Sequence, residues 1–474
     1  MPARQRTLTL TVMCVGMFLV LLDVTIVNVA LPSLRSDLGA GVSELQWIVD
    51  GYAVAIAALM LPCGDLGDRA GHKRVVLAGL AAFGAGSLMA GLAPGPAVLV
   101  AARVVQGCGA ALLLPGTLAV VARAYEDPRE RARAFGIWAA ISSLALPAGV
   151  ILGGLLVEGP GWRWAFLVNL PVIAVALPMA AAVVRETREP SGRALDAPGT
   201  VLGAAVLGTA TFALIERSAA AGAGAAALLA AFLWVERRSA DPMLPIALFR
   251  RPPFAIAAAV AATMNLGSNG TLFVLTLFLQ DVQGRSPVGA GLVCLPAFAT
   301  LALVATPAGR LVGRKGSREP MCAGLVCSAA GLALLVNGPD AWAFVLWGAG
   351  LGLITPAVVA ASMGAVGPER AGLASAVNNT ARQVGNAVGI AAAGTVAGAP
   401  GAAGFVAGFH AVALAACGLY LAAAAVAFVG LRASSLAASV PRRGADLSAR
   451  GRTRRCAARA TGVSAGAPPR GRGR

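Results

Sequence analysis

Charged side chains are scarce in this chain. Asp, Glu, Lys and Arg make up 12% of its 474 residues, about half the share in a typical soluble protein. Hydrophobic residues make up 58%, and the mean hydropathy is +0.77. Apolar runs of the roughly 20 residues that a membrane span requires recur from residue 8 to residue 431. These features exclude a soluble globular protein and predict an all-α integral membrane protein.

Residues and motifs for metal binding and catalysis are scarce too. The chain has two histidines and eight scattered cysteines without a CxxC pair, so neither a metal site nor a disulfide framework is expected. A GxxxxGK[ST] motif is missing, which disfavours an ATP-driven pump. No loop between the apolar runs holds a nucleophile–base pair, which disfavours a membrane enzyme. We expect no catalytic residue, no metal and no cofactor.

Apolar runs between charged or Pro/Gly-rich breaks predict fourteen membrane-spanning helices. They lie at 8–30, 45–63, 75–93, 96–122, 134–157, 164–184, 198–215, 219–235, 254–279, 288–309, 320–337, 342–366, 372–397 and 405–431. With the N-terminus inside, 32 of the 38 Lys and Arg residues fall on the inner side and four in outer loops. The positive-inside rule therefore predicts a multi-pass protein of the cell membrane with both termini in the cytoplasm.

The net charge of +17 is concentrated in the C-terminal segment. Residues 432–474 hold eleven arginines and one acid, with no apolar periodicity. Such a composition predicts a disordered basic tail on the cytoplasmic side rather than a nucleic-acid-binding domain. We expect no nucleic-acid partner.

A short basic segment with several glycines occurs twice. Gly64–Arg74 links the second and third predicted spans, and Gly309–Arg318 links the tenth and eleventh, 245 residues later. The two copies are therefore eight predicted helices apart. Two six-helix halves with an inserted helix pair between them give this offset, and parallel halves are typical of rocking transporters. The predicted organisation is an N-terminal segment at 1–7, a half at 8–184, a linker with the inserted pair at 185–253, a half at 254–431 and the tail at 432–474.

One carboxylate, Asp23, lies inside the first apolar run. An ionised side chain at mid-bilayer is costly and usually functional. The first span supplies no base beside Asp23, so burial would favour its neutral form, and we predict that it gains and loses a proton. The alternative is an Asp that only hydrogen-bonds a neighbouring group within the bundle.

Polar residues recur on one face of several other spans. Arg103, Gln106, Gly107 and Ala110 share a face of the fourth span, so Arg103 should face the bundle interior, either in proton coupling or as a static charge on buried carbonyls. Stripes in the ninth and thirteenth spans should line a wet cavity or pair between helices. The candidates for the substrate cavity are Asn28, Gln106, Asn265, Asn269, Asn379, Arg382 and Gln383. With two arginines and one carboxylate deep in the spans, neutral, weakly anionic or monocationic lipophilic substrates are favoured.

Five segments resemble motifs of the major facilitator superfamily, in its fourteen-span drug:proton antiporter branch (the EmrB/QacA-like group). The chain is also similar to actinobacterial exporters of the methylenomycin-resistance type. The segments are 22–32, 64–74 (motif A), 103–111 (motif B), 161–171 and 374–385. The resemblance spans roughly residues 8–431 and implies two six-helix halves with an inserted pair.

The resemblance also implies roles for residues. Motif B implies that Arg103 takes part in proton coupling. Motif A implies a cytoplasmic gate formed by Gly64, Asp68, Arg69, Gly71, Lys73 and Arg74. The antiporter motif of the fifth span corresponds to Gly149, Gly153 and Gly154, with its proline displaced to Pro147. Two pairs of glycines are spaced four residues apart, Gly149 with Gly153 and Gly385 with Gly389. This spacing favours close helix packing.

The function that follows is proton-coupled export of small organic compounds by alternating access. Its expected partners are a small-molecule substrate, protons and the lipid bilayer, the energy source is the proton gradient, and the expected oligomeric state is a monomer. A metabolite carrier of the same fold, working as an importer or a uniporter, stays open as the alternative.

Overall fold

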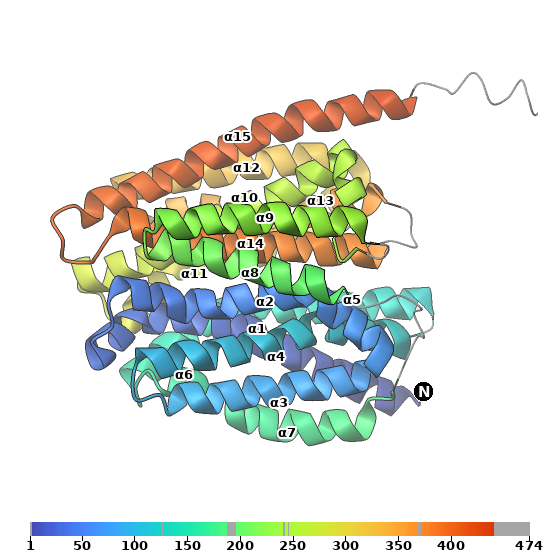
Figure 1. Cartoon of the computed structure of the whole chain (residues 1–474), viewed down its shortest axis with the longest axis horizontal. Coiled ribbons are helices and arrows are strands. Elements are labelled where there is room, and N and C mark those ends of the chain that lie inside the picture. Colours follow the sequence, from blue (N-terminus) through green and yellow to red (C-terminus); the bar gives the residue numbers. More distant parts are fainter. Residues whose placement is uncertain are drawn as a thin grey trace, which may run out of the picture. The chain divides into compact units, whose positions relative to one another are not determined.

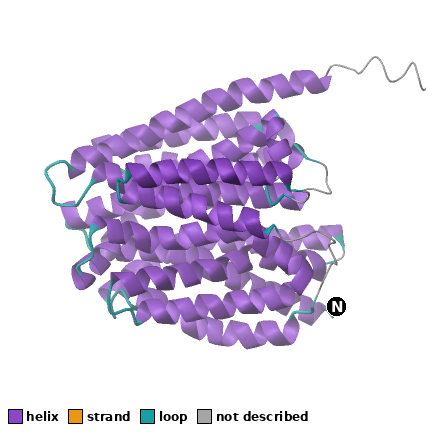
Figure 2. Ribbon diagram, in the orientation of Figure 1, coloured by secondary structure: helices purple, strands orange, loops and turns teal. Residues whose placement is uncertain are grey.

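The computed structural model describes residues 2–125, 127–186, 196–239, 242–244, 246–366 and 371–439. The chain divides into two units, Met1–Leu431 and Arg432–Arg474, of which the first holds the helical body. Within the described residues the regular structure is helical throughout (Figure 2). Most of the predicted basic tail lies outside the described residues.

The helices follow one another through the first unit (Figure 1). In chain order they are α1 (Ala3–Leu38), α2 (Val42–Ala70), α3 (His72–Gly91), α4 (Pro96–Ala124), α5 (Pro128–Glu158), α6 (Trp164–Leu167), α7 (Asn169–Val183), α8 (Ala197–Ile215), α9 (Ala219–Arg238), η1 (Ile246–Arg250), α10 (Pro252–Leu277), η2 (Phe278–Val282), α11 (Pro287–Lys315), α12 (Arg318–Leu334), η3 (Leu335–Asn337), α13 (Ala341–Gly364), α14 (Ala371–Ala397) and α15 (Phe405–Ser439).

The predicted all-α membrane architecture is confirmed. Among the described residues, 13 helices are long and apolar enough to cross a membrane. The one predicted span that is not among these 13 is 372–397, which forms α14; this helix is 27 residues long but carries Asn, Arg and Gln through its middle turns. The predicted span at 164–184 is interrupted at Val168, between α6 and α7.

The two repeated basic segments are mostly helix rather than loop, which corrects the predicted boundaries. α2 continues to Ala70 and α3 begins at His72, so the link is Gly71, at a φ of 103°. In the second copy α11 continues to Lys315, and Gly316 follows at a φ of 80°. Glycine reaches these positive φ values without the steric cost of a Cβ. The helices therefore extend beyond their apolar runs until a glycine ends them.

Helices α1–α7 form one half of the bundle and α10–α15 the other (Figure 1). The inserted pair α8–α9 packs against the interface between the halves, where α8 contacts both α2 and α14. Glycines allow α10 and α14 to approach closely: a Cβ at Gly385 or Gly389 would meet the backbone of α10 at Ala262 or Leu266. The two ends of the bundle are called the amino end, where α1 begins, and the far end, where α1 stops at Leu38.

The two halves are joined at the far end. Arg35 of α1 forms an ion pair of 3.1 Å with Asp281, which follows α10. Gln46 of α2 donates to the carbonyls of Ile390 and Ala391 on α14, at 3.2 and 2.7 Å. This ion pair and these two hydrogen bonds hold the two halves together at the far end in this conformation. Toward the amino end, a separate apolar cluster packs Leu61 of α2 against η1, α10 and α14.

Candidate functional site

An ion pair between Asp23 and Arg103 lies in the core of the first half. Nη1 of Arg103 donates to Oδ2 of Asp23 at 2.5 Å, and both side chains are 0% exposed. Asp23 is on α1 and Arg103 on α4, so the pair connects two helices that are 80 positions apart in sequence. Since water is excluded from both partners, each charge depends on the other for its stabilisation.

This pair corrects the expectation of an acid without a base nearby. The first span supplies no base, as predicted, but α4 supplies Arg103. Sequence periodicity places Arg103 on the inner face of its helix, and the structure finds it there. Which helix it faces depends on packing between distant segments, which a single sequence does not contain.

Gln106 extends the pair into a polar network. Its Oε1 accepts from Nη1 of Arg103 at 2.8 Å, while its Nε2 donates to Oδ1 of Asp23 at 3.3 Å and to Oγ of Ser87 at 2.8 Å. Ser87 of α3 also accepts from Nδ2 of Asn169, at the start of α7. Gln106 was predicted as a cavity residue, but it is 0% exposed within this charged network. It holds the Asp23 carboxylate in place.

Arg103 has further partners on α2. Its Nε donates to the carbonyl of Ile48 at 3.0 Å, and its guanidinium lies 4.3 Å from the ring centroid of Tyr52. Tyr52 in turn donates to the carbonyl of Val20 on α1. Nη2 of Arg103 is buried and has no hydrogen-bond partner among the described residues. The cation is thus held by several helices, whereas Asp23 is held by Arg103 and Gln106.

The two members of the pair differ in their chemistry. If Asp23 were to take up a proton, the ion pair would become a hydrogen bond from a guanidinium to a neutral carboxyl, which is weaker than the pairing of two opposite charges. Arg103 stays charged, because guanidinium groups keep their proton in proteins. Ser87, Asn169 and Tyr52 were not predicted as members of this network. The only feature of these residues in the sequence is that each is a polar side chain within an apolar span.

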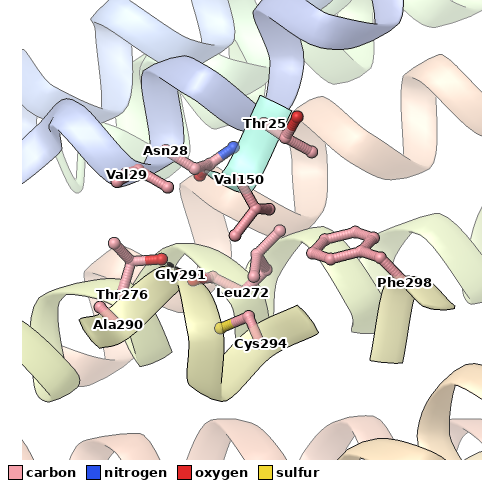
Figure 3. A pocket seen from close by; sticks show the side chains of 10 residues that line it. All are labelled: Thr25, Asn28, Val29, Val150, Leu272, Thr276, Ala290, Gly291, Cys294 and Phe298. Atoms are coloured by element: carbon pink, nitrogen blue, oxygen red, sulfur yellow. Dashed lines mark hydrogen bonds between the residues drawn. The ribbon is translucent and has the colours of Figure 1, made fainter. Parts of the chain in front are cut away.

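A small cavity lies between the two halves, next to this cluster on α1. Thr25, Asn28 and Val29 of α1 face Leu272 and Thr276 of α10 and Cys294 of α11 across it (Figure 3). The space in it that is open to the centre of a water molecule is about 10 Å³, which is just enough to hold one water. Oδ1 of Asn28 is buried with no partner among the described residues. The structure therefore places the candidate Asn28 between the halves, in a cavity too small for an organic substrate in this conformation.

The other cavity candidates lie on α10 and α14. Asn265 and Asn269 are half-buried, and their amides donate to backbone carbonyls one turn earlier on α10. Asn379, Arg382 and Gln383 are half-buried on α14. Ser268 of the same predicted stripe bonds Tyr420 of α15 at 2.7 Å, so part of the stripe pairs between helices.

The motif-A residues meet other parts of the first half. Oδ1 of Asp68 lies 3.4 Å from Nη2 of Arg123 on α4 and 3.1 Å from Nε2 of His72. Lys73 donates through Nζ to the carbonyl of Ala181 on α7, and Arg74 lies 3.6 Å from Glu186. Gly64 and Arg69 are in the last turns of α2, and Gly71 ends the helix. The segment therefore connects α2, α4 and the end of α7 at the amino end.

The three glycines of α5 lie at two helix interfaces. A Cβ at Gly149 would collide with Thr25 and Leu22 of α1, and one at Gly153 would touch Ile26. At Gly154 a Cβ would come within 2.7 Å of Cα of Val288, on α11 of the other half. α5 thus packs against the helix that carries Asp23 and against the opposite half, although its proline is displaced to Pro147 within the helix.

A second buried acid, Asp50, stands apart from the cluster. It is 0% exposed, and neither of its carboxylate oxygens has a hydrogen-bond partner among the described residues. An uncompensated buried charge is very costly, so we expect this carboxyl to be neutral in the present conformation. Asp50 follows Gln46 by one turn and shares the face of α2 that contacts α14.

We expect Asp50→Asn to change the free energy of unfolding by less than about 1 kcal/mol, because a neutral carboxyl and an amide are alike in size and charge. Thermal unfolding of the purified protein measures this. A much larger loss of stability would show that Asp50 carries a charge that the described contacts do not explain.

Groups of three or more His, Cys, Asp or Glu residues that could hold a metal ion do not occur within the described part of the chain. Its seven described cysteines are all free thiols.

Comparison with known proteins assigns the family. The model of the Major Facilitator Superfamily matches residues 13–390. The chain belongs to the major facilitator superfamily. It is 38% identical over 408 residues to the multidrug resistance protein Stp of Mycobacterium tuberculosis, covering 83% of this chain and 76% of that protein. It is 35% identical over 406 residues to the methylenomycin A resistance protein of Streptomyces coelicolor, covering 82% of this chain and 85% of that protein.

Solved structures of the superfamily share the fold. A bacterial homologue of the human lysosomal transporter Spinster, in an inward-facing and unoccupied conformation, superposes with a TM-score of 0.66 at 18% identity. That likeness covers 91% of this chain and 98% of the other. As a member of the major facilitator superfamily, the chain is a multi-pass membrane transporter with two helical halves, as its sequence resemblance implied.

Proposed function

We propose that this protein exports small organic compounds from the cell in exchange for protons. The observation that carries the proposal is the fully buried network of Asp23, Arg103 and Gln106, the one place in the described spans where a carboxylate meets a cation away from water. Relatives named for drug resistance support export as the direction of transport. Both termini are proposed to lie in the cytoplasm, which makes the far end the external end.

The position of α1 suggests how a proton would drive movement. α1 carries Asp23, packs against α5 at Gly149 and bonds the other half through Arg35. Val29 of α1 also accepts from Gln280, which follows α10, at 3.0 Å. Protonation of Asp23 would weaken the attachment of α1 to α4 and so change the balance between two arrangements of the halves.

Accumulation in cells tests the proposal. Cells that lack their own exporters would be loaded with a panel of labelled compounds that includes methylenomycin A, with and without the protein. We expect lower accumulation of at least one compound in cells that contain the protein, and a protonophore should abolish the difference. An effect that survives the protonophore would favour a uniporter, and raised accumulation would favour an importer. No effect on any compound would contradict drug export.

A further inference from the structure

Arg382 is a cation inside the second half that has no counter-ion among the described residues. It is half-buried near the middle of α14, eleven residues after the start of that helix. Its guanidinium makes no hydrogen bond, ion pair or ring contact with any residue of the described ranges. Arg103, by contrast, has Asp23, Gln106, a backbone carbonyl and an aromatic ring around it. Guanidinium groups away from bulk water normally pair with an anion, so Arg382 stands out.

The direction of Arg382 follows from its neighbours on α14. Gly385 faces α10, and Arg382 lies roughly 60° from it around the helix, at 100° per residue. Thr395 faces α8, where its hydroxyl donates to the carbonyl of Leu214, and Arg382 lies roughly 140° from it. Gly394 faces Gln46 of α2, in the opposite half. Arg382 lies roughly 120° from Gly394, so it is on the arc between α10 and α2 and nearer to α10.

Unpartnered amides flank Arg382 on the same helix. Asn378, one turn before it, is 3% exposed, and Asn386, one turn after it, is 8% exposed. Oδ1 of each is buried without a hydrogen-bond partner among the described residues. Buried polar groups are usually satisfied, and several orphans around one cation indicate a missing ligand or water. These oxygens accept hydrogen bonds, so they call for a donor, such as a water molecule or an O–H or N–H group of a ligand, beside an anion that Arg382 would hold.

The charges of the surrounding helices favour an anion. From α10 to α15, the described spans contain no Asp or Glu between their end turns. In the first half, Asp23 is already paired with Arg103, and the carboxylate oxygens of Asp50 have no hydrogen-bond partner among the described residues, so neither acid compensates Arg382. An organic cation would meet an uncompensated positive charge here, whereas a carboxylate would form a charge-assisted and potentially bidentate pair with Arg382.

We infer that Arg382 binds the anionic group of the transported compound, and that the preferred substrates are lipophilic monoanions such as aryl carboxylates. The inference rests on the proposed function, because it assigns a substrate class to that transporter. Oδ1 of Asn378 and Oδ1 of Asn386 accept from a donor group of the compound or from water beside the carboxylate, and the apolar remainder of the compound lies between the halves. The anion contacts α14 in the second half, and the proton binds Asp23 in the first.

Three fluorescent probes that differ mainly in charge test this inference. Dansylglycine is a monoanion, dansylglycinamide is its neutral amide, and dansylcadaverine is a monocation. Their binding to the purified protein in lipid nanodiscs is measured by fluorescence titration without any proton gradient. We expect wild-type protein to bind dansylglycine at least tenfold more tightly than the other two.

Arg382→Gln should remove this preference, and Arg382→Lys, which keeps the charge but loses the planar fork, should retain part of it. Thermal unfolding of both variants reports whether they are folded, and the Lys variant controls for a general loss of packing. The inference is overturned if wild-type protein binds the three probes equally or not at all, or if Arg382→Gln keeps the tenfold preference.

Because binding is measured without a gradient, this result is independent of the direction and coupling of transport. Anion preference that depends on Arg382, together with no export in cells, would support the site and contradict the proposed function. Export in cells that shows no dependence on probe charge or on Arg382 would support the function and contradict the site.

Discussion

Asp23→Asn is expected to abolish proton-driven export and also to destabilise the protein, whereas adding Arg103→Gln should restore stability but not export. The single change leaves a buried guanidinium without its anion, a situation that costs about 3–5 kcal/mol. Removing both charges leaves two neutral polar groups that can bond each other and Gln106. Thermal unfolding and cellular accumulation, measured on the same variants, separate the two effects.

The double variant makes this test informative even if the single variant fails to fold. A folded Asp23→Asn/Arg103→Gln protein that no longer lowers accumulation shows that Asp23 does more than complete the packing. Asp50→Asn, an identical change at another buried acid, serves as the matched control for stability. Uphill export by the double variant would contradict proton transfer at Asp23.

A disulfide between positions 46 and 394 is expected to stop transport until it is reduced. In Gln46→Cys/Gly394→Cys, the sulfur at position 46 would take the place of Cγ of Gln46, which lies 2.9 Å from the Cβ that position 394 would carry. A disulfide needs about 3.0 Å between a sulfur and the Cβ of its partner. The bond would join α2 to α14 across the halves and keep the far end closed.

Each single-cysteine variant is the control, since the chain has other free thiols. Oxidation should block export by the double variant alone, and a reductant should restore it. Cross-linking in high yield with undiminished export would show that α2 and α14 need not separate at the far end. Failure to cross-link would contradict the contact between Gln46 and Gly394.

The sequence predicts the architecture well because membrane helices leave a strong pattern. Long apolar runs and the distribution of Lys and Arg follow directly from the cost of polar groups in lipid. The exception in hydropathy, α14, differs for a physical reason, since it carries Asn378, Arg382 and Asn386 in its middle turns. The ends of α2 and α11 were misplaced because their last turns are polar, and only Gly71 and Gly316 end them.

The candidate site was predicted only in part. A charge in an apolar run identifies Asp23 and Arg103 individually, because isolated charges in lipid are costly. Their pairing, and the position of Gln106 within it, depend on how α1 packs against α4, about which local patterns carry no information. The same limit applies to Asp50 and Arg382, whose ionisable groups have no partner among the described residues. Both become notable only when their neighbours are known.

Proton movement driven by substrate is the most direct test that Asp23 couples protons to transport. Purified protein would be placed in liposomes with a trapped pH-sensitive dye, and a gradient of an exported compound would be imposed at equal pH. We predict that wild-type protein moves protons against the direction of the compound, and that Asp23→Asn/Arg103→Gln moves none. Equal proton movement by both proteins, or compound movement by wild-type protein without protons, would contradict the account.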